Sequence, residues 1–278
     1  MSLTRIAAFA DGESGGNPAG VYISDSHPSE QEMQSLAAEV GYSETAFAEP
    51  AGDSWRVRYF SPENEVPFCG HATIALGAAL AQSRGVGIYK LSLNEADISV
   101  EGFCKSDIYS AALQSPQTHS TAADAAMVKE ALQLFGYQDT DLDPELAPAF
   151  AHAGANHLVV GLNSRHALSA MSYELDAGRQ FMLAAGLVTV MFVYAENKRL
   201  FHSRNPFASG GVHEDPATGA ASAAFAGRLR DIDWPHTGEI DIIQGEDMGA
   251  RSLIKVELSD VRGSSVRVSG ATRFIEVA

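Results

Sequence analysis

The clearest helical pattern in the chain lies between Ser29 and Gly41. Apolar side chains recur there at intervals of three and four residues, at Met33, Leu36, Ala37 and Val40, and this spacing places them on one face of a helix. Ser29 and Glu32 have the spacing of a capping box, and Gly41 is a residue type that commonly ends a helix. We therefore expect an amphipathic helix over this segment.

Two alanine-rich segments show a different pattern. Gly70–Leu80 and Pro216–Leu229 are apolar on all sides, and a helix of that kind is buried. Around them, short apolar runs bounded by turn residues predict strands, and two more segments, 123–135 and 176–185, predict helices. The predicted strands cover residues 6–9, 19–23, 42–48, 55–60, 88–93, 97–100, 107–113, 157–162, 187–195, 239–244, 252–258, 264–268 and 273–277.

The alanine-rich segments also indicate an internal repeat. When residues 70–80 are aligned with residues 215–225, five of eleven positions are identical, and a strand pair, a loop and a proline precede the helix in each half. We therefore predict an α+β fold in which two similar barrel-like domains of antiparallel strands each surround a central helix. The small polar stretch 115–122 is the expected linker between a domain at 1–118 and a domain at 119–278, with the option that a C-terminal strand at 270–278 joins the first. The site of such a duplicated fold is expected between the halves.

Composition and charge narrow the possible partners. The 278 residues carry a formal net charge of −16, which repels phosphate backbones and anionic membrane surfaces, so we expect neither nucleic acid nor membrane as a partner. Two cysteines, Cys69 and Cys104, make no disulfide framework and fit a reducing compartment. The longest uncharged stretch is too short to span a bilayer. We therefore expect a soluble cytoplasmic protein.

Several common catalytic and ligand-binding motifs are absent from this chain or lack the structural context that they need. Residues 12–16 fit the hydrolase pattern G-x-S-x-G, but a β-rich segment follows where that motif needs a helix. The sequence contains neither a dinucleotide-binding nor a phosphate-binding glycine loop. The nine histidines include no pair with metal-ligand spacing, so we expect no metal.

The starts of the two predicted buried helices are candidate anion sites. One helix would begin at Cys69-Gly70-His71 and the other at Asp215-Pro216. The first N–H groups of a helix bind anions through hydrogen bonds and the helix dipole, so two such ends would hold a carboxylate. The alternatives are that Asp215 is an ordinary N-cap and that Gly70 provides packing room.

Glu44 is the strongest candidate for proton transfer. It lies in a segment that reads as a half-buried strand, where desolvation would suit a carboxylate to general acid/base work. The alternative is an edge-strand glutamate that points to water. Cys69 is either a thiol activated at a helix start or a small buried residue, and His71 either contacts substrate or bonds to backbone.

Five segments of the chain resemble the PhzF-like family, the phenazine-biosynthesis isomerases and their relatives. They are spread over most of the chain in the family's order and end with Gln244-Gly-Glu-Asp-Met-Gly249. The resemblance implies the fold of diaminopimelate epimerase, a homodimer, no cofactor and a small carboxylate as substrate. The other four segments are Phe9–Val21, Gly41-Tyr-Ser-Glu-Thr-Ala-Phe47, Tyr59–Thr73 with its Cys-Gly-His-Ala-Thr motif, and Glu214-Asp-Pro-Ala-Thr-Gly219.

The family's site residues are carried over position by position. The catalytic glutamate falls on Glu44, with Asp215 and His71 as its catalytic partners. Substrate-binding positions fall on Asn17, Ser43, Cys69, Gly70, Gly219 and Ala220. At Ala220 the phenazine enzyme has a serine, so one hydroxyl contact with its substrate is missing here.

Three functions follow from these residues. The leading hypothesis is a cofactor-independent isomerase in which Glu44 alone takes a proton from one carbon of a conjugated carboxylate and returns it at another. A racemase or epimerase would instead need two bases on opposite faces of one carbon, Cys69 and Asp215. The third possibility is a carboxylate-binding protein without enzymatic activity.

Overall fold

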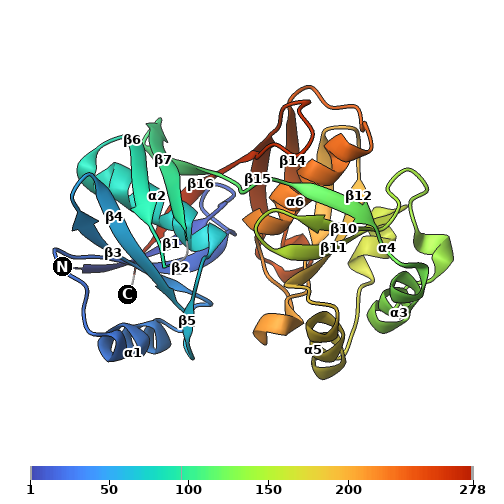
Figure 1. Ribbon diagram of the computed structural model, residues 1–278, viewed down its shortest axis with the longest axis horizontal. Helices are drawn as coiled ribbons and strands as arrows, with labels where there is room; N and C mark the ends of the chain where they lie inside the picture. The colour runs from blue at the N-terminus through green and yellow to red at the C-terminus, as the bar shows by residue number, and fades with distance from the viewer. Residues whose placement is uncertain (1, 95, 277–278) are drawn as a thin grey trace. The chain divides into compact units, whose positions relative to one another are not determined.

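A computed structural model describes residues 2–94 and 96–276, and the chain divides into two compact units (Figure 1). Unit 1 combines Met1–Gln114 with Ser269–Ala278, and unit 2 comprises Ser115–Val268. The chain therefore passes from one unit to the other twice, the second time within strand β16 (Arg267–Ile275).

Unit 1 is a ring of paired strands. Its hydrogen-bonded order is β1-β2-β3-β4-β6-β7-β8-β16, and β1 also pairs with β16, which closes the path. The short strand β5 pairs with β4 outside this ring. With β16, the strands are β1 (Ser2–Ala8), β2 (Asn17–Ile23), β3 (Thr45–Ala51), β4 (Ser54–Phe60), β5 (Glu65–Val66), β6 (Gly87–Ser92), β7 (Asp97–Lys105) and β8 (Ile108–Gln114).

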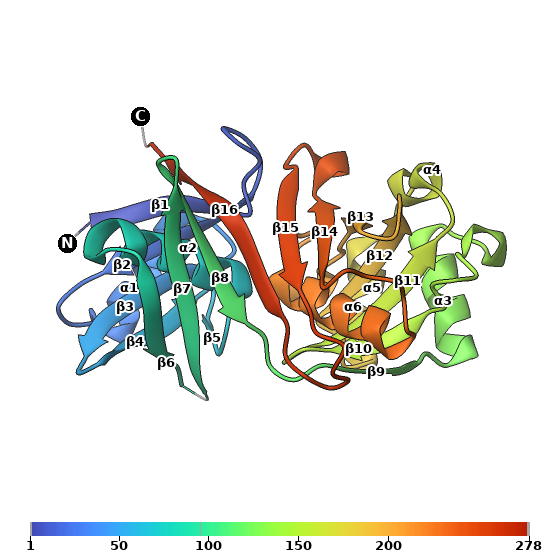
Figure 2. The ribbon, with the colours of Figure 1, turned by 90° about the horizontal axis from the view of Figure 1, so that it is seen from above.

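Helix α2 (Gly70–Arg84) is enclosed by this ring, as Figure 2 shows from above. It packs against β1 and β2 as well as β7 and β8, and every residue from His71 to Ala81 is buried. The predicted all-round burial is confirmed. Gly77 and Gly102 allow the close approach, because a Cβ on Gly102 would lie 2.4 Å from the Gly77 carbonyl oxygen. The second helix, α1 (Glu30–Val40), has the predicted Ser29–Glu32 capping box and left-handed Gly41.

Unit 2 builds its strands in the order β15-β14-β13-β12-β11-β10-β9. The central helix α6 (Gly219–Asp231) packs against β9, β10, β11 and β15, and most of its residues are buried, as predicted. The strands are β9 (His119–Ala122), β10 (Ala149–His152), β11 (Asn156–Leu162), β12 (Thr189–Ala195), β13 (Leu200–Arg204), β14 (Glu239–Gln244) and β15 (Ser252–Glu257).

A second core in unit 2 lies beneath its outer helices. Aromatic side chains of α3 and β12, Phe135 and Phe192, meet there with ring centroids 5.0 Å apart. Leu132, Leu168 and Met182 complete the contact from three helices. These helices are α3 (Ala125–Phe135), α4 (Arg165–Ser169) and α5 (Leu175–Ala184); three short 3-10 turns cover Asp139–Asp141, Ala208–Gly210 and Glu246–Met248.

The two units repeat one topology. The series β1-β2-α1-β3-β4-α2-β6-β7 in unit 1 matches β10-β11-α5-β12-β13-α6-β14-β15 in unit 2. Strands before and after each of these helices pair in parallel, and the remaining neighbours in both series pair antiparallel. The prediction of purely antiparallel strands was therefore wrong at four pairs, because a helical crossover returns the chain in the same direction.

Other sequence predictions need correction. The expected linker 115–122 contains strand β9, and β10 and α4 were not predicted. The two strands expected at 264–268 and 273–277 are one strand, β16, over the described residues; residue 277 lies outside them. Polar and small residues at 269–272 interrupt the apolar pattern, although the strand is continuous there and pairs with β1 from Thr272 onward.

Across residues 2–94 and 96–276, no helix has the length and apolar character needed to cross a bilayer.

Candidate functional site

Glu44 lies just before β3, and not within a strand as predicted. Its backbone carbonyl accepts a hydrogen bond from the Gly20 amide at 3.2 Å, which fixes the chain next to β2. The side chain is 12% exposed. The carboxylate is therefore largely buried, as expected, but it lies one residue before the start of β3.

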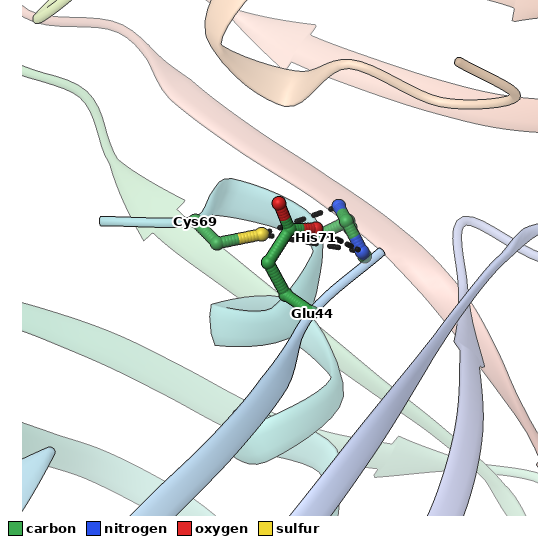
Figure 3. Close-up of side chains that lie close together, drawn as sticks. All are labelled: Glu44, Cys69 and His71. Carbon is green, nitrogen blue, oxygen red and sulfur yellow. Dashed lines mark hydrogen bonds and ion pairs between the residues drawn. The ribbon is translucent and has the colours of Figure 1, made fainter. Parts of the chain in front are cut away.

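His71 lies at the first turn of α2 and is the centre of a compact cluster (Figure 3). Its Nε2 lies 3.3 Å from the Ser43 hydroxyl and 3.5 Å from Glu44 Oε2. The thiol sulfur of Cys69 lies 3.3 Å from Nδ1 and 3.9 Å from Nε2 of the same ring. Three candidates, Ser43, Glu44 and Cys69, thus contact the imidazole of a fourth, His71, and the four come from two separate sequence segments.

The backbone of Cys69 is held by hydrogen bonds from Thr73, which is itself bonded to Tyr59. Its carbonyl accepts the Thr73 amide at 3.0 Å and the Thr73 hydroxyl at 2.7 Å. The phenol of Tyr59, fully buried, lies 2.7 Å from the same Thr73 hydroxyl. Burial raises the pKa of Tyr59, so this phenol stays protonated and can donate. Tyr59 and Thr73 anchor the start of α2, and the sequence analysis assigned them no role.

The cluster combines three acid/base groups in a small volume. The ligand atoms of Glu44, Cys69 and His71 all lie within 4.8 Å of one another. A carboxylate next to an imidazole can take up a proton while the ring donates a hydrogen bond to it. A thiol, an imidazole and a carboxylate are also a donor set that could hold a metal ion. Histidine spacing in the sequence could not show this, because the set contains one histidine.

Asp215, the remaining catalytic candidate, belongs to unit 2. It is 8% exposed, and its carboxylate accepts a hydrogen bond from the Thr218 hydroxyl. Gln244 binds the same turn, since its amide donates to the Asp215 carbonyl at 2.6 Å and to the Thr218 hydroxyl at 3.0 Å. The Thr218 amide in turn donates to Gln244 Oε1 at 3.2 Å. Gln244 stood in a matching family segment, but it was not among the predicted site residues.

The neighbour of Asp215 is held by a second interaction. Glu214, 7% exposed, accepts two hydrogen bonds from the Arg204 guanidinium, at 3.0 and 2.6 Å. Arg204 also donates to the carbonyls of Ser169 and Met171. This bidentate pair fixes the loop on the N-terminal side of Asp215 and neutralises the charge of Glu214.

Helix α6 begins later than predicted. Its first residue is Gly219 and its N-cap is Thr218, whereas Pro216 and Asp215 lie in the preceding turn. Thr218 has an extended backbone, and its side chain is bound to Asp215, so the helix cannot start earlier. Counted from the helix start, Thr218 matches Cys69, the N-cap of α2, and Gly219 matches Gly70. The predicted alignment of Gly70 with Asp215 therefore differs by four residues from a match of the two helix starts.

The other predicted positions are distributed over both units. Asn17 is the first residue of β2 and is 2% exposed. Gly70 is the first residue of α2, and Gly219 and Ala220 are the first two of α6. The side chain of neither N-cap, Cys69 or Thr218, accepts a capping hydrogen bond from a backbone amide of the helix that it begins. The first N–H groups of both helices therefore lack the usual side-chain cap.

Comparison with known proteins supplies the family. The sequence profile of the PhzC–PhzF family, described as phenazine biosynthesis-like protein, matches residues 6–276. An uncharacterised isomerase of Bacillus subtilis is 28% identical, over 99% of this chain and 96% of the relative. The trans-2,3-dihydro-3-hydroxyanthranilate isomerase of Pseudomonas aeruginosa is 31% identical, over 95% of this chain and 94% of that enzyme.

Solved structures show the same fold. A PhzF-family protein of Bacillus anthracis matches with a TM-score of 0.88 and 20% identity, over 99% of this chain and 96% of that chain. A probable proline racemase of Agrobacterium radiobacter matches with a TM-score of 0.66 and 12% identity, over 99% and 92%. At these low identities the structural matches establish only the fold. The family is established by the sequence profile and by the relatives with similar sequences. The chain belongs to the phenazine biosynthesis-like PhzC–PhzF family and is an enzyme of the isomerase type.

Proposed function

We propose that this protein is a cofactor-independent isomerase of a small carboxylate, with Glu44 as the group that moves the proton. The observation that carries the proposal is the 12%-exposed Glu44 carboxylate, 3.5 Å from Nε2 of the buried His71. A general base needs an available lone pair and a neighbour that holds it in place. His71 is that neighbour of Glu44, and the Ser43 hydroxyl lies 3.3 Å from His71 Nε2.

The reaction balances with one base. Glu44 removes a proton from carbon, and the electron pair of the broken C–H bond enters the conjugated system of the substrate. The protonated Glu44 then delivers the proton to a second carbon on the same face, where a new C–H bond forms. His71, with Nε2 3.5 Å from Glu44 Oε2, keeps the carboxylate in place. The substrate's own carboxylate takes no part in the proton transfer.

The substrate class rests on the relatives and on the helix starts. Relatives in Pseudomonas aeruginosa and Pseudomonas chlororaphis are named for trans-2,3-dihydro-3-hydroxyanthranilate. Uncapped N–H groups at Gly70 and Gly219 suit a carboxylate. Ala220 removes a hydroxyl contact, so we propose a related carboxylate and not that compound itself as the best substrate.

The proposal also gives Asp215 and the two units a role. We propose that one substrate molecule contacts Glu44 from unit 1 and Asp215 from unit 2. The two units would then be the barrel-like domains, 1–118 and 119–278 with 270–278 joined to the first, and the site would lie between them. The repeated strand–helix topology and the matching helix starts support this arrangement. Asp215, held by Thr218, would orient the substrate.

An epimerase is the second candidate, and one contact favours it. The Cys69 thiol lies 3.3 Å from His71 Nδ1, and an adjacent imidazole helps to form a thiolate, the basic form of cysteine. Cys69 and Asp215 would then be the two bases. The structural neighbours include proteins named as racemases and as isomerases, so the fold is compatible with either reaction.

Uptake of deuterium from solvent tests both. Small cyclic and amino carboxylates are first screened for thermal stabilisation, since a ligand that binds only the folded state raises its melting temperature. A bound compound is then incubated with enzyme in heavy water. The isomerase predicts a product with a shifted double bond, which carries deuterium at the second carbon to the extent that protonated Glu44 exchanges with solvent before it delivers the proton. The epimerase predicts deuterium at one carbon with inverted configuration. If every bound carboxylate keeps both its double bond and its configuration and takes up no deuterium, both reactions are contradicted and carboxylate binding without turnover is left.

We propose that the protein works as a homodimer without a cofactor, as the family resemblance implies. The cytoplasmic location is proposed from the cysteine usage. Light scattering coupled to size-exclusion chromatography measures the mass directly, and a mass near 29.5 kDa, that of one chain, would contradict the dimer.

A further inference from the structure

We propose that Glu44, Cys69 and His71 form a binding site for a soft divalent cation of the zinc type, and that its occupancy switches the enzyme off. The three side chains converge on one small volume, as Figure 3 shows, and their ligand atoms all lie within 4.8 Å of one another. They come from two segments, because Glu44 precedes β3 whereas Cys69 and His71 begin α2.

The distances suit a tetrahedral ion. Zinc binds cysteine sulfur at about 2.3 Å and histidine nitrogen or carboxylate oxygen at about 2.0–2.2 Å, so neighbouring ligand atoms lie roughly 3.3–3.6 Å apart. In the structure, His71 Nε2 lies 3.5 Å from Glu44 Oε2 and 3.9 Å from Cys69 Sγ. Small side-chain rotations would bring all three to one ion through the same ring nitrogen.

The donor chemistry and the burial point the same way. Thiolate, imidazole and carboxylate together favour zinc over magnesium or calcium, which prefer oxygen ligands alone. Cys69 is 8% and His71 6% exposed, so little water competes for them. The Ser43 hydroxyl, 3.3 Å from His71 Nε2, lies near the fourth position. Water or a substrate carboxylate could occupy that position too.

Binding would remove the proton acceptor. The ion would use the Glu44 lone pair that the proposed reaction needs, and the Cys69 thiol would release its proton to solvent on becoming a thiolate ligand. The cation is therefore an inhibitor and not a resident cofactor. Binding itself is independent of the proposed function, whereas the inhibition rests on it.

Titration of the metal-free protein with Co²⁺ tests the site without any substrate. Cobalt bound to a thiolate gives a sulfur-to-metal charge-transfer absorption, which reports cysteine ligation directly. We expect this band at one equivalent of Co²⁺ and its displacement by Zn²⁺. Cys69→Ser should abolish the band, and His71→Asn and Glu44→Gln should weaken Zn²⁺ binding by at least about 100-fold.

Cys104→Ser is the matched control. Cys104 is an exposed thiol in β7, so its loss should leave the band unchanged. Circular dichroism shows whether Cys69→Ser and His71→Asn fold, and Glu44→Gln repeats the affinity test at a residue outside the helix. A band that persists in Cys69→Ser or disappears in Cys104→Ser overturns the proposed site, as does a wild-type protein that shows no band.

The inhibition is measured separately. Zn²⁺ should inhibit turnover of a substrate found by the carboxylate screen, and a chelator should restore it in both wild type and Cys104→Ser. If cobalt binds through Cys69 but zinc leaves turnover unchanged or raises it, the inhibitory role is wrong and the base assignment of Glu44 is contradicted with it. If cobalt does not bind, the metal site is wrong while the Glu44 mechanism stands.

Discussion

The buried hydroxyl pair beneath the candidate site provides a sharp test of what fixes the start of α2. Thr73 donates its single hydroxyl hydrogen to the Cys69 carbonyl, 2.7 Å away. The Tyr59 phenol, 2.7 Å from the same oxygen, must therefore be the donor in the Tyr59–Thr73 bond. Tyr59 and Thr73 are both fully buried, so water cannot replace a lost partner.

The two single substitutions should differ in cost. Tyr59→Phe removes a donor and leaves Thr73 still bonded to Cys69, so we expect a loss of about 0.5–1.5 kcal/mol, the net value of one hydrogen bond. Thr73→Val keeps the shape but leaves the Tyr59 hydroxyl without an acceptor. An unsatisfied buried group adds about 1–3 kcal/mol, so the total is expected at about 2–4 kcal/mol.

The double substitution decides between this account and simple packing. With Tyr59→Phe added to Thr73→Val, no hydroxyl is left unsatisfied, so the pair should be no less stable than Thr73→Val alone. The coupling free energy would then be at least as large as the Tyr59→Phe loss, about 0.5–1.5 kcal/mol, whereas independent sites add within about 0.5 kcal/mol. Additive losses would show that the hydroxyl pair does not hold the helix start.

Urea unfolding of the full chain measures these differences. The protein has two tryptophans, Trp55 in β4 of unit 1 and Trp234 in unit 2. In a Trp234→Phe background the fluorescence of Trp55 reports unit 1, which contains both substituted residues. Thr73→Ser is the control, because it retains the hydroxyl and should avoid the penalty for the stranded phenol.

Three further predictions concern stability. Gly102→Ala should cost at least about 2 kcal/mol in the same unfolding assay, because its Cβ would lie 2.4 Å from the Gly77 carbonyl oxygen; a smaller loss would mean that α2 can shift away from β7. Burial lowers the pKa of His157 to about 3, below the ordinary 6.5, so the folded state loses stability as pH falls below 6.5, by up to about 1.4 kcal/mol per unit. Between pH 6 and 4, the free energy of unfolding of His157→Gln should fall less steeply with pH than that of the wild type, by up to about 1.4 kcal/mol per pH unit. An unchanged slope would refute the lowered pKa of His157. Arg204→Met should cost about 3–5 kcal/mol by leaving Glu214 buried without its partner, and Arg204→Met with Glu214→Leu should recover part of that loss; no recovery would contradict the pairing argument.

The sequence predicted the central helices because their composition is extreme. The Gly70–Leu80 segment is apolar on every side, and burial of such a helix follows directly from the hydrophobic effect. Strand direction had no comparable signal, since parallel and antiparallel neighbours can carry the same apolar runs. The helix between two strands was visible in the sequence, and it should have indicated a parallel crossover.

The site was predictable to the extent that it is local in the chain. Ser43 and Glu44 stand together, as do Cys69 and His71, and the structure brings both pairs around one imidazole. The start of α6 was not predictable from Pro216, a common first helical residue. There the Thr218 amide donates a tertiary hydrogen bond to Oε1 of Gln244, 26 residues away, and this bond overrides the local preference.

The Glu44→Gln variant tests most directly whether Glu44 carries the proton. Glutamine keeps the shape of the side chain beside His71, but its amide cannot accept the proton from carbon. With a carboxylate that the wild-type enzyme turns over, we predict a fall in kcat of about 10²–10⁴-fold for Glu44→Gln, with an unchanged melting temperature. Cys69→Ala, folded to the same extent, should retain most of the activity. Full activity in Glu44→Gln, or loss of turnover in Cys69→Ala alone, would contradict the one-base mechanism.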